Sequence, residues 1–319
     1  MRIAFTSCQD VIRDAEQNAW RTLAQQQPDH IVLLGDNIYM DYKFGPPHSP
    51  RPVREMALPE FSALMHGRYA AQWNVASFQQ AVRAVGVQVH AIWDDHDFAW
   101  NNARGGSGDE DDEEYVSPDR RRLSRLLFEQ YRQALKAKPP AYPPNPCPDG
   151  VVPVAQDLGG VQAMIRLSTN IHLHLLDGRS FRQSRGGFFK KLGKPRAHML
   201  GELQRADVAS ALLPMPGINL LASGTTLKDW AKYVDLAWLQ AQAATHRIVL
   251  LSGDVHHPVF STKAGVVEMT ASAIAQPPSV TKLFKRKTEV FGILDVNEAT
   301  GQAEATFWHE GRVLMSQAV

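Results

Sequence analysis

The chain has 319 residues, of which 44% are hydrophobic and 21% charged, and its formal net charge is +1 at pH 7. This length can bury a large core, and the composition is ordinary for a globular protein. The small net charge excludes a general electrostatic attraction to nucleic acid or to anionic membranes. The two cysteines, Cys8 and Cys147, are too few for a disulfide framework and favour a reducing compartment.

The N-terminal segment reads MRIAFTSCQD and predicts a strand from the start. It lacks the charged region, long apolar stretch and cleavage site of a signal peptide. No apolar run approaches the ~20 residues that a membrane helix requires. We therefore expect a cytoplasmic protein without a membrane partner.

The first half of the chain predicts a βαβ unit, then further helices and a third strand. In chain order these elements are a strand over 3–6, a helix over 11–26, strands over 31–34 and 87–93 separated by a helix over 61–85, and a helix over 118–137. Asp10 is the expected N-cap of the first helix. The strand after that helix should return parallel to the first strand.

The second half alternates strands and helices and then becomes rich in strands. Strands are predicted over 162–168, 171–176, 218–222 and 248–252, and helices over 201–213 and 229–245. Residues 265–314 alternate between apolar and polar side chains and predict antiparallel strands that complete a second sheet. The proline-rich segment 138–148 could mark a domain boundary. Because the motifs on both sides of it must share one site, we expect a single domain over residues 1–319.

Three apolar strands end in acidic or imidazole side chains, in the segments IVLLGDNIY (31–39), HAIWDDHD (90–97) and RIVLLSGDVHH (247–257). The carboxyl ends of parallel strands meet at one rim, where α/β proteins hold ligands and metals. Thiol, carboxylate, phenol and imidazole groups on converging strand ends predict a two-metal site of the kind that cleaves phosphoryl groups. The strand-end residues are Cys8, Asp36, Tyr39, Asp95, His96, Asp97, Asp177, Arg179, Asp254 and His256.

The ordered motifs SCQ, GDNIY, WDDHD, LDGRSFR and LSGDVHHP resemble those of the alkaline phosphatase D-like (PhoD-like) family, within the metallophosphoesterase superfamily. The resemblance spans residues 5 to about 258. It implies an α/β fold, a four-layer αββα sandwich with two mixed β-sheets packed face to face. It also implies hydrolysis of phosphate esters at a dinuclear metal centre.

The metal ligands implied by the resemblance are Cys8, Asp36, Tyr39, Asp95, Asp254 and His256. Asp36 would bridge the two ions. A thiolate, a phenolate and an imidazole on the first ion suit Fe³⁺, whereas the remaining carboxylates suit a hard ion such as Ca²⁺, Mg²⁺ or Mn²⁺ over Zn²⁺. We therefore expect Fe³⁺ with Ca²⁺, and Mn²⁺ or Mg²⁺ as alternatives to Ca²⁺. Outside this context Cys8 could be a small buried hydrophobe and Tyr39 a core side chain.

The resemblance also implies roles in catalysis, with in-line attack on phosphorus by a metal-bound hydroxide. His96 would protonate the leaving alkoxide or stabilise a phosphate oxygen, and Asp97 could orient His96. Arg179 and Arg182 offer planar guanidinium groups that fit a phosphate.

Some assignments stay open. Asp94 competes with Asp95, since adjacent residues of an extended strand point in opposite directions. We choose Asp95 from its place before the histidine. Asp177 is either a ligand or the residue that orients Arg179. The basic loop 182–196 is either a solvated face or a flap that recognises anionic substrates.

The predicted activity is that of a phosphomonoesterase of the alkaline phosphatase type, acting on a small-molecule phosphate ester. A phosphodiesterase on the same metals is the first alternative, because nothing in the sequence distinguishes monoester from diester. A non-catalytic iron-binding or redox protein is the second, and the presence of His96 argues against it. Nucleic-acid binding has only the basic loop and Lys282–Lys287 in its favour, so we expect no nucleic-acid partner. The sequence does not predict the oligomeric state.

Overall fold

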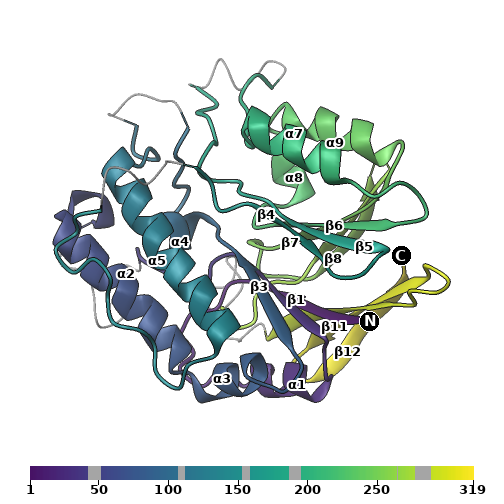
Figure 1. Ribbon diagram of the computed structural model, residues 1–319, viewed down its shortest axis with the longest axis horizontal. Coiled ribbons are helices and arrows are strands. Elements are labelled where there is room, and N and C mark those ends of the chain that lie inside the picture. Colours follow the sequence, from purple (N-terminus) through teal and green to yellow (C-terminus); the bar gives the residue numbers. More distant parts are fainter. Residues whose placement is uncertain (42–51, 107–111, 153–158, 187–194, 264, 277–288) are drawn as a thin grey trace, which may run out of the picture.

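The computed structural model describes residues 1–41, 52–106, 112–152, 159–186, 195–263, 265–276 and 289–319. Two six-stranded sheets lie between two sets of helices, and both sheets contain parallel and antiparallel neighbours (Figure 1). Contacts between strands of opposite sheets show that the sheets pack against each other. The predicted four-layer α/β sandwich with two mixed sheets is confirmed.

The first sheet consists of β1 (Arg2–Thr6), β2 (His30–Leu34), β3 (Gln88–Ile92), β10 (Val290–Val296), β11 (Ala303–His309) and β12 (Arg312–Ala318). Its strand order is β12-β11-β10-β1-β2-β3. β1, β2 and β3 run parallel, whereas β10, β11 and β12 are joined to β1 by antiparallel pairing. The predicted βαβ unit is therefore present.

The second sheet consists of β4 (Ala163–Arg166), β5 (Ile171–Leu175), β6 (Ile218–Ser223), β7 (Arg247–Ser252), β8 (Val259–Lys263) and β9 (Val266–Thr270). Its order is β4-β5-β6-β7-β9-β8. The four central strands are parallel, and the edge strands β4 and β8 are antiparallel to their neighbours. The carboxyl ends of β5, β6 and β7 thus share one rim.

The prediction that residues 265–314 complete the second sheet as antiparallel strands is only partly right. β9 joins that sheet but runs parallel to β7, and β10 to β12 extend the first sheet instead. Phe5 of β1 pairs with Gly292 of β10, where an added Cβ would lie 2.2 Å from the Phe5 ring. The strand with a glycine at this position therefore fits beside β1, a pairing that alternation alone does not specify.

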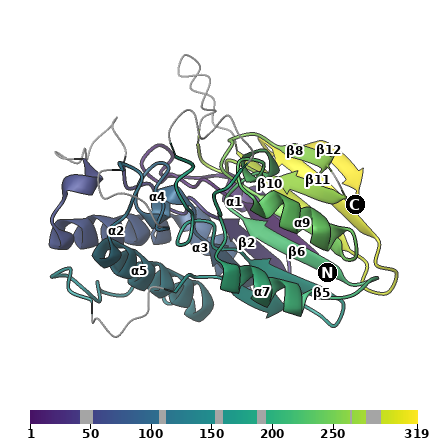
Figure 2. The same ribbon diagram turned by 90° about the horizontal axis from the view of Figure 1, so that it is seen from above.

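The helices lie on the outer faces of the sheets (Figures 1 and 2). On the side of the first sheet are α1 (Ala19–Gln25), α2 (Leu58–Trp73), α3 (Ala76–Val82), the short α4 (Asp95–Phe98) and α5 (Pro118–Ala137), with a 3₁₀ turn, η1, at Val53–Glu55. Against the second sheet lie α7 (Glu202–Ala211), α8 (Leu227–Trp230) and α9 (Asp235–Ala243). None of the helices in the described ranges is long and apolar enough to span a bilayer.

The helix predicted over 11–26 is shorter in the structure, because α1 begins only at Ala19. The Asp10 carboxylate accepts the backbone N–H of Ile12, and the Asp14 carboxylate accepts that of Gln17. Such local side-chain to backbone bonds compete with helical hydrogen bonding. Asp10 therefore closes a turn after β1 rather than capping the helix.

Two other predicted helices are each divided into two. The helix predicted over 61–85 becomes α2 and α3, because Val75 between them is extended with ψ 115°. The helix predicted over 229–245 becomes α8 and α9. Here the Asp235 carboxylate at the start of α9 accepts the backbone N–H of Met199, which anchors that helix to a different loop. The helix predicted over 118–137 agrees with α5 residue for residue.

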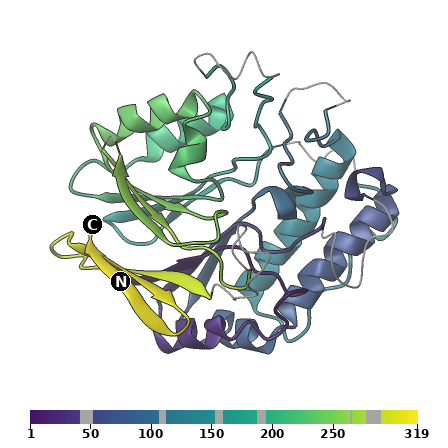
Figure 3. The same cartoon turned by 180° about the vertical axis from the view of Figure 1, so that it is seen from behind.

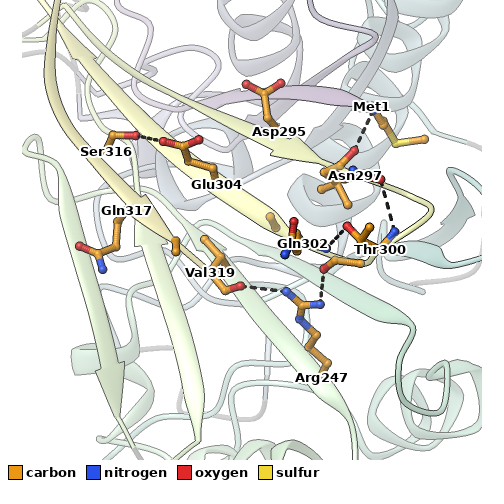
Figure 4. Close-up of a pocket in the computed structure, with 14 residues that line it drawn as sticks. Met1, Arg247, Asp295, Asn297, Thr300, Gln302, Glu304, Ser316, Gln317 and Val319 are labelled. Carbon is orange, nitrogen blue, oxygen red and sulfur yellow. Dashed lines mark hydrogen bonds between the residues drawn. The ribbon is translucent and has the colours of Figure 1, made fainter.

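A groove of about 820 Å³ is lined by residues of both sheets at the edge where the chain termini lie side by side (Figures 1, 3 and 4). Arg247, at the start of β7, donates hydrogen bonds to the carbonyl oxygens of Gly301 and Val319 there. Met1 also lines the groove, directly before β1. The groove therefore lies at the beginning of these strands, whereas the predicted site residues follow their ends.

Candidate metal centre and active site

The loops that follow β1 and β2 bring three predicted metal ligands together. The backbone N–H of Cys8 donates to the carbonyl oxygen of Gly35 at 3.2 Å, which holds the two loops side by side. The Asp36 Oδ2 atom then lies 3.3 Å from Cys8 Sγ and 3.2 Å from the Tyr39 hydroxyl, which donates to it. All three side chains are buried. The first predicted ligand group is thus assembled except for His256.

Asp36 also lies at the meeting point of two sets of possible metal donors. In each set the three ligand atoms lie within 4.8 Å of one another. One set is Asp36, Asp94 and Asp254, and the other is Asp36, Asp95 and His96. The structure therefore brings both Asp94 and Asp95 to Asp36, and it is Asp94 that lies with Asp254. Among the described residues, neither set includes His256, whose backbone N–H donates to the Ser272 hydroxyl at 3.3 Å.

Four of the six predicted ligands have a left-handed backbone conformation. Their φ angles are 58° at Cys8, 52° at Asp36, 70° at Asp254 and 54° at His256. This region is unfavourable for residues other than glycine, and such residues cluster at functional sites. The backbone at these strand ends is therefore shaped to turn the side chains into the site at a conformational cost.

Several carboxylate oxygens of the site are buried and accept no hydrogen bond from the described residues: Asp36 Oδ1, Asp94 Oδ2 and Asp95 Oδ1. Burial raises the pKa of Asp36 well above its ordinary value. Burial, with the nearby charges of Asp94 and Asp95, raises the pKa of Asp254 to about 7. Because buried carboxylate oxygens without hydrogen bonds are costly, bound cations would stabilise this arrangement. The donor set fits a metal centre of hard oxygen ligands with one thiol and one phenol beside it.

Arg179 is held against the acidic cluster. Its Nε donates to Asp94 Oδ1 at 2.5 Å, and its Nη2 lies 3.5 Å from Asp95 Oδ1. Burial opposes the charge, but these two carboxylates raise the pKa of Arg179 well above its ordinary value. Burial would raise the pKa of Asp95. The charge of Arg179 has the opposite effect, and the pKa of Asp95 is lowered to about 2. The guanidinium therefore stays charged beside both donor sets.

Arg182 is buried one turn beyond Arg179, and its guanidinium group mainly contacts other residues of the protein. Its Nε donates to the carbonyl oxygen of Gly178 at 2.7 Å, and its Nη2 donates to the Thr225 hydroxyl at 2.5 Å. Its guanidinium also lies 5.4 Å from the centre of the Tyr233 ring. Its predicted contact with a phosphate is not tested by this geometry and stays a prediction.

Asp177 is surrounded by donors from its own loop and from neighbouring strands. Its Oδ1 accepts the indole N–H of Trp93 and the backbone N–H groups of Arg179 and Ser180, each at 2.9 Å. Its Oδ2 accepts the backbone N–H of Val161, also at 2.9 Å. Of the two roles left open by the sequence, these contacts favour a residue that orients the Arg179 loop.

His96 lies beside Tyr39 and has a partner that the sequence analysis missed. Its Nδ1 lies 2.5 Å from Asp41 Oδ1, and its ring centre is 4.3 Å from that of Tyr39. Burial lowers the pKa of His96, but the charges of Asp36 and Asp41 outweigh burial and raise this pKa well above its ordinary value. Asp41 lies five residues after Asp36 in GDNIYMD, so a second carboxylate after the motif is the signal that could have identified it.

The carboxylate of Asp97 contacts Asn37 and Asp94 rather than His96, which it was predicted to orient. Its Oδ2 accepts from the backbone and the side-chain amide of Asn37, and its Oδ1 accepts the backbone N–H of Asp94 at 2.5 Å. No side-chain hydrogen bond or ion pair joins Asp97 to His96 in the part of the chain that the structure describes. Asp97 therefore ties the loop after β2 to the loop after β3, and Asp41 has the position expected for the partner of His96.

The remaining basic side chains that the sequence analysis singled out are only partly visible. Arg182 and Arg185 belong to the described part of the basic loop 182–196. The lysines of that loop lie outside the described residues, as does the second basic segment: Lys190, Lys191, Lys194 and Lys282–Lys287. A flap that recognises anionic substrates stays a prediction.

Gly224, directly after β6, gives Asp94 its space. A Cβ atom at Gly224 would lie 2.4 Å from Cγ and 2.7 Å from Oδ1 of Asp94. We expect Gly224→Ala to displace Asp94 and to lower turnover by about 100-fold, since a shift of ~1 Å near the chemistry has that effect. Steady-state hydrolysis rates would measure the loss. Gly178→Ala is the matched control, because a Cβ there meets nothing closer than 3.4 Å. Equal activity of the two variants would show that the position of Asp94 does not matter.

One family of known proteins and several solved structures are similar to this chain. The family model described as PhoD-like phosphatase matches residues 3–217. A solved structure titled "Structure of PhoD" is 17% identical, with a TM-score of 0.66, and the match covers 100% of this chain and 72% of that one. At this identity the similarity supports the fold.

Two further solved structures are more distant. GAP50, described as the anchor in the inner membrane complex of Plasmodium, is 11% identical with a TM-score of 0.44, and the match covers 100% of this chain and 88% of GAP50. Yfce, a phosphoesterase from E. coli, is 11% identical with a TM-score of 0.34, and both chains are covered completely. No match was found among curated proteins.

Proposed function

The chain belongs to the PhoD-like phosphatase family and is a metal-dependent phosphoric ester hydrolase, and from this premise we propose that it is a phosphomonoesterase of the alkaline phosphatase type. The observation that carries the proposal is the position of Asp36, which belongs to both donor sets and contacts the thiol and the phenol. A carboxylate shared in this way suits two neighbouring ions, the arrangement used for phosphoryl transfer.

Two ions would be held by different kinds of ligand. In the proposed centre, Cys8, Tyr39 and His256 hold one ion together with Asp36, and a thiolate and a phenolate suit Fe³⁺. Asp36, Asp254 and a carboxylate of the Asp94–Asp95 pair hold the other, which suits Ca²⁺, Mn²⁺ or Mg²⁺. The proximity of Asp94 to Asp254 supports Asp94 as that carboxylate, in place of the predicted Asp95. When bound, such ions lower the pKa of water and neutralise charge on phosphoryl oxygens.

The protein residues around the centre have distinct roles in this proposal. His96 protonates the leaving alkoxide, and Asp41 holds the imidazole in position and keeps it charged. Arg179 supplies positive charge beside the carboxylates for the phosphoryl oxygens, with Arg182 behind it as a second source of charge. Asp97 acts through Asp94, whose backbone it holds, rather than on the substrate.

The substrate is a small-molecule phosphate ester in this proposal, and no nucleic-acid or membrane partner is required. A cytoplasmic location and a single domain over residues 1–319 stay predictions. A large apolar cluster that includes residues of both sheets supports the single domain.

Metal analysis combined with model substrates tests the proposal. Native protein should contain iron together with calcium, and should hydrolyse 4-nitrophenyl phosphate faster than bis(4-nitrophenyl) phosphate. A phenolate on Fe³⁺ should give a visible charge-transfer band. A Ca²⁺-selective chelator should stop turnover but leave the colour, and Ca²⁺ or Mn²⁺ should restore activity better than Zn²⁺, because carboxylates prefer hard ions.

Each contrary result has its own meaning. Faster hydrolysis of the diester would identify a phosphodiesterase. Bound iron without hydrolysis of either ester would favour the non-catalytic iron protein. A colourless enzyme that is fully active with zinc alone would contradict the mixed iron site.

A further inference from the structure

The segment that follows β9, residues 271–275, is bound to strand ends of both sheets. The backbone N–H of Ile274 donates to the carbonyl oxygen of Ser7, directly after β1 in the first sheet, at 3.1 Å. The backbone N–H of Ala271 donates to the carbonyl oxygen of Ser252, the last residue of β7 in the second sheet, at 3.3 Å. The segment therefore joins two strand ends that each lead into predicted metal ligands.

Ser272 lies in this segment and contacts two of those ligands. Its side chain is completely buried. Its hydroxyl donates to Cys8 Sγ at 3.2 Å and accepts the backbone N–H of His256 at 3.3 Å. Among the described residues, His256 belongs to neither set of three donor atoms around Asp36. The Ser272 hydroxyl is thus a direct link between His256 and the sulfur beside that carboxylate.

The direction of the two hydrogen bonds follows from the groups involved. A backbone N–H can only donate, so the single proton of the Ser272 hydroxyl is directed to the sulfur. The hydroxyl of Ser7 also donates to Cys8 Sγ, at 3.4 Å. Gly253 leaves the space for it, since an added Cβ would lie 2.7 Å from Ser7 Oγ. Two hydroxyl donors on one buried sulfur complement a thiolate, the form in which cysteine binds a metal.

We propose that Ser272 is a positioning residue of the metal centre, which holds His256 beside Cys8 and hydrogen-bonds the thiolate that binds the first ion. This inference rests on the proposed metal centre and adds a residue that the sequence analysis did not consider. Outer partners of metal ligands orient these ligands and tune the metal. Hydrogen bonds to a ligating sulfur also change the redox potential of the metal. Ser272 acts through its two neighbours.

The variant Ser272→Ala removes the hydroxyl and adds no bulk. Iron affinity should fall about 10- to 100-fold, because the thiolate loses a donor and the His256 N–H loses its acceptor. In the iron-loaded variant the sulfur is a stronger electron donor. Its charge-transfer band should therefore shift to longer wavelength, and the Fe³⁺/Fe²⁺ potential should fall. Titration against a competing chelator, absorption spectra and redox titration measure these changes, and none of them depends on turnover.

Ser7→Ala is the matched variant for the link to His256. It removes a hydroxyl donor from the same sulfur but leaves the acceptor of the His256 N–H in place. It should shift the band in the same direction and lower iron affinity less than Ser272→Ala. Ser272→Ala should also cost less affinity in a His256→Ala background than in the wild type, because coupled residues are not additive. Equal losses from the two serine variants, or additive losses with His256→Ala, would overturn the positioning role.

Ser77→Ala controls for the loss of a buried hydroxyl elsewhere in the protein. Ser77 is buried on α3, and its hydroxyl donates to the carbonyl oxygen of Glu16 at 2.6 Å. This variant should melt at a lower temperature and keep the iron affinity, band and potential of the wild type. If Ser272→Ala behaves in the same way as Ser77→Ala, Ser272 has only a structural role and the inference is wrong.

Metal binding keeps this inference separate from the proposed activity. Co²⁺ loaded into the metal-free protein gives a thiolate band whichever ion is native, so the same variants can be compared without iron. Changes in affinity and band that depend on Ser272, in a protein that hydrolyses no monoester, would support the positioning role and refute the phosphomonoesterase. An active enzyme in which neither the iron-loaded nor the Co²⁺-loaded form has a thiolate band would refute the inference and leave the activity intact.

Discussion

The variant Asp36→Asn is expected to lose phosphate ester hydrolysis and at least one metal ion. Asp36 is the residue common to both donor sets, and its Oδ2 also contacts the thiol of Cys8 and the hydroxyl of Tyr39. An amide has no negative charge to share between two ions. Changes to mere outer partners of a metal site cost about 10- to 100-fold, so removal of a shared ligand should exceed 100-fold. Metal content and kcat on 4-nitrophenyl phosphate are the measurements.

Asp177→Asn is the matched control for this experiment. Asp177 is another buried aspartate directly after a strand, but its carboxylate oxygens accept hydrogen bonds from Trp93, Val161 and the Arg179 loop. This variant should lose about 1–3 kcal/mol of folding stability, the cost of leaving buried partners unsatisfied, and should keep its metals. If it loses metals as fully as Asp36→Asn, the loss in both reflects disturbed loops rather than a missing ligand.

Removal of the His96 imidazole should give the second large effect. His96→Ala is expected to lower kcat by roughly 10²–10⁴-fold, the usual contribution of a positioned acid. The loss should be smaller for 4-nitrophenyl phosphate than for an alkyl phosphate, because a good leaving group needs no proton. Rates on a series of esters with different leaving-group pKa values would measure this dependence.

Asp41→Asn refines the same experiment. Asp41 contacts His96 Nδ1 and contributes to the raised pKa of that histidine. Its replacement should lower kcat less than His96→Ala but with the same dependence on the leaving group. An equal loss for good and poor leaving groups in His96→Ala would refute the acid role and favour electrostatic stabilisation of the phosphate. Loss of metal from His96→Ala would instead indicate that His96 is a ligand, as its closeness to Asp36 and Asp95 permits.

Local patterns determined much of the fold and the chemistry of the site. The helix at 118–137 has one buried face at helical spacing, and the strand before Asp36 is an apolar run that stops at Gly35. Such patterns depend only on neighbouring residues, so the sequence alone can show them. The sequence also showed that carboxylates follow several parallel strands. That order is enough to predict one acidic rim, because the carboxyl ends of parallel strands meet there.

Other features depended on residues that are far apart in the chain. The alternating pattern after residue 265 showed strands but not their neighbours, and only the structure showed that β10 pairs with β1 in the first sheet, where Gly292 lies opposite Phe5. The two carboxylates before His96 look equivalent in the sequence. Only in three dimensions is Asp94 distinguished from Asp95, because Asp94 accepts the hydrogen bond from Arg179 Nε and lies close to Asp254.

The contacts between polar side chains also depend on residues that are far apart in the chain. The sequence placed Asp97 next to His96, but hydrogen bonds follow direction in space, and His96 meets Asp41 from another strand end. Residue type and local pattern thus determined which chemistry is available, and packing decided which groups share it, because charge and hydrogen bonding act across distances of a few ångströms that the chain order does not specify.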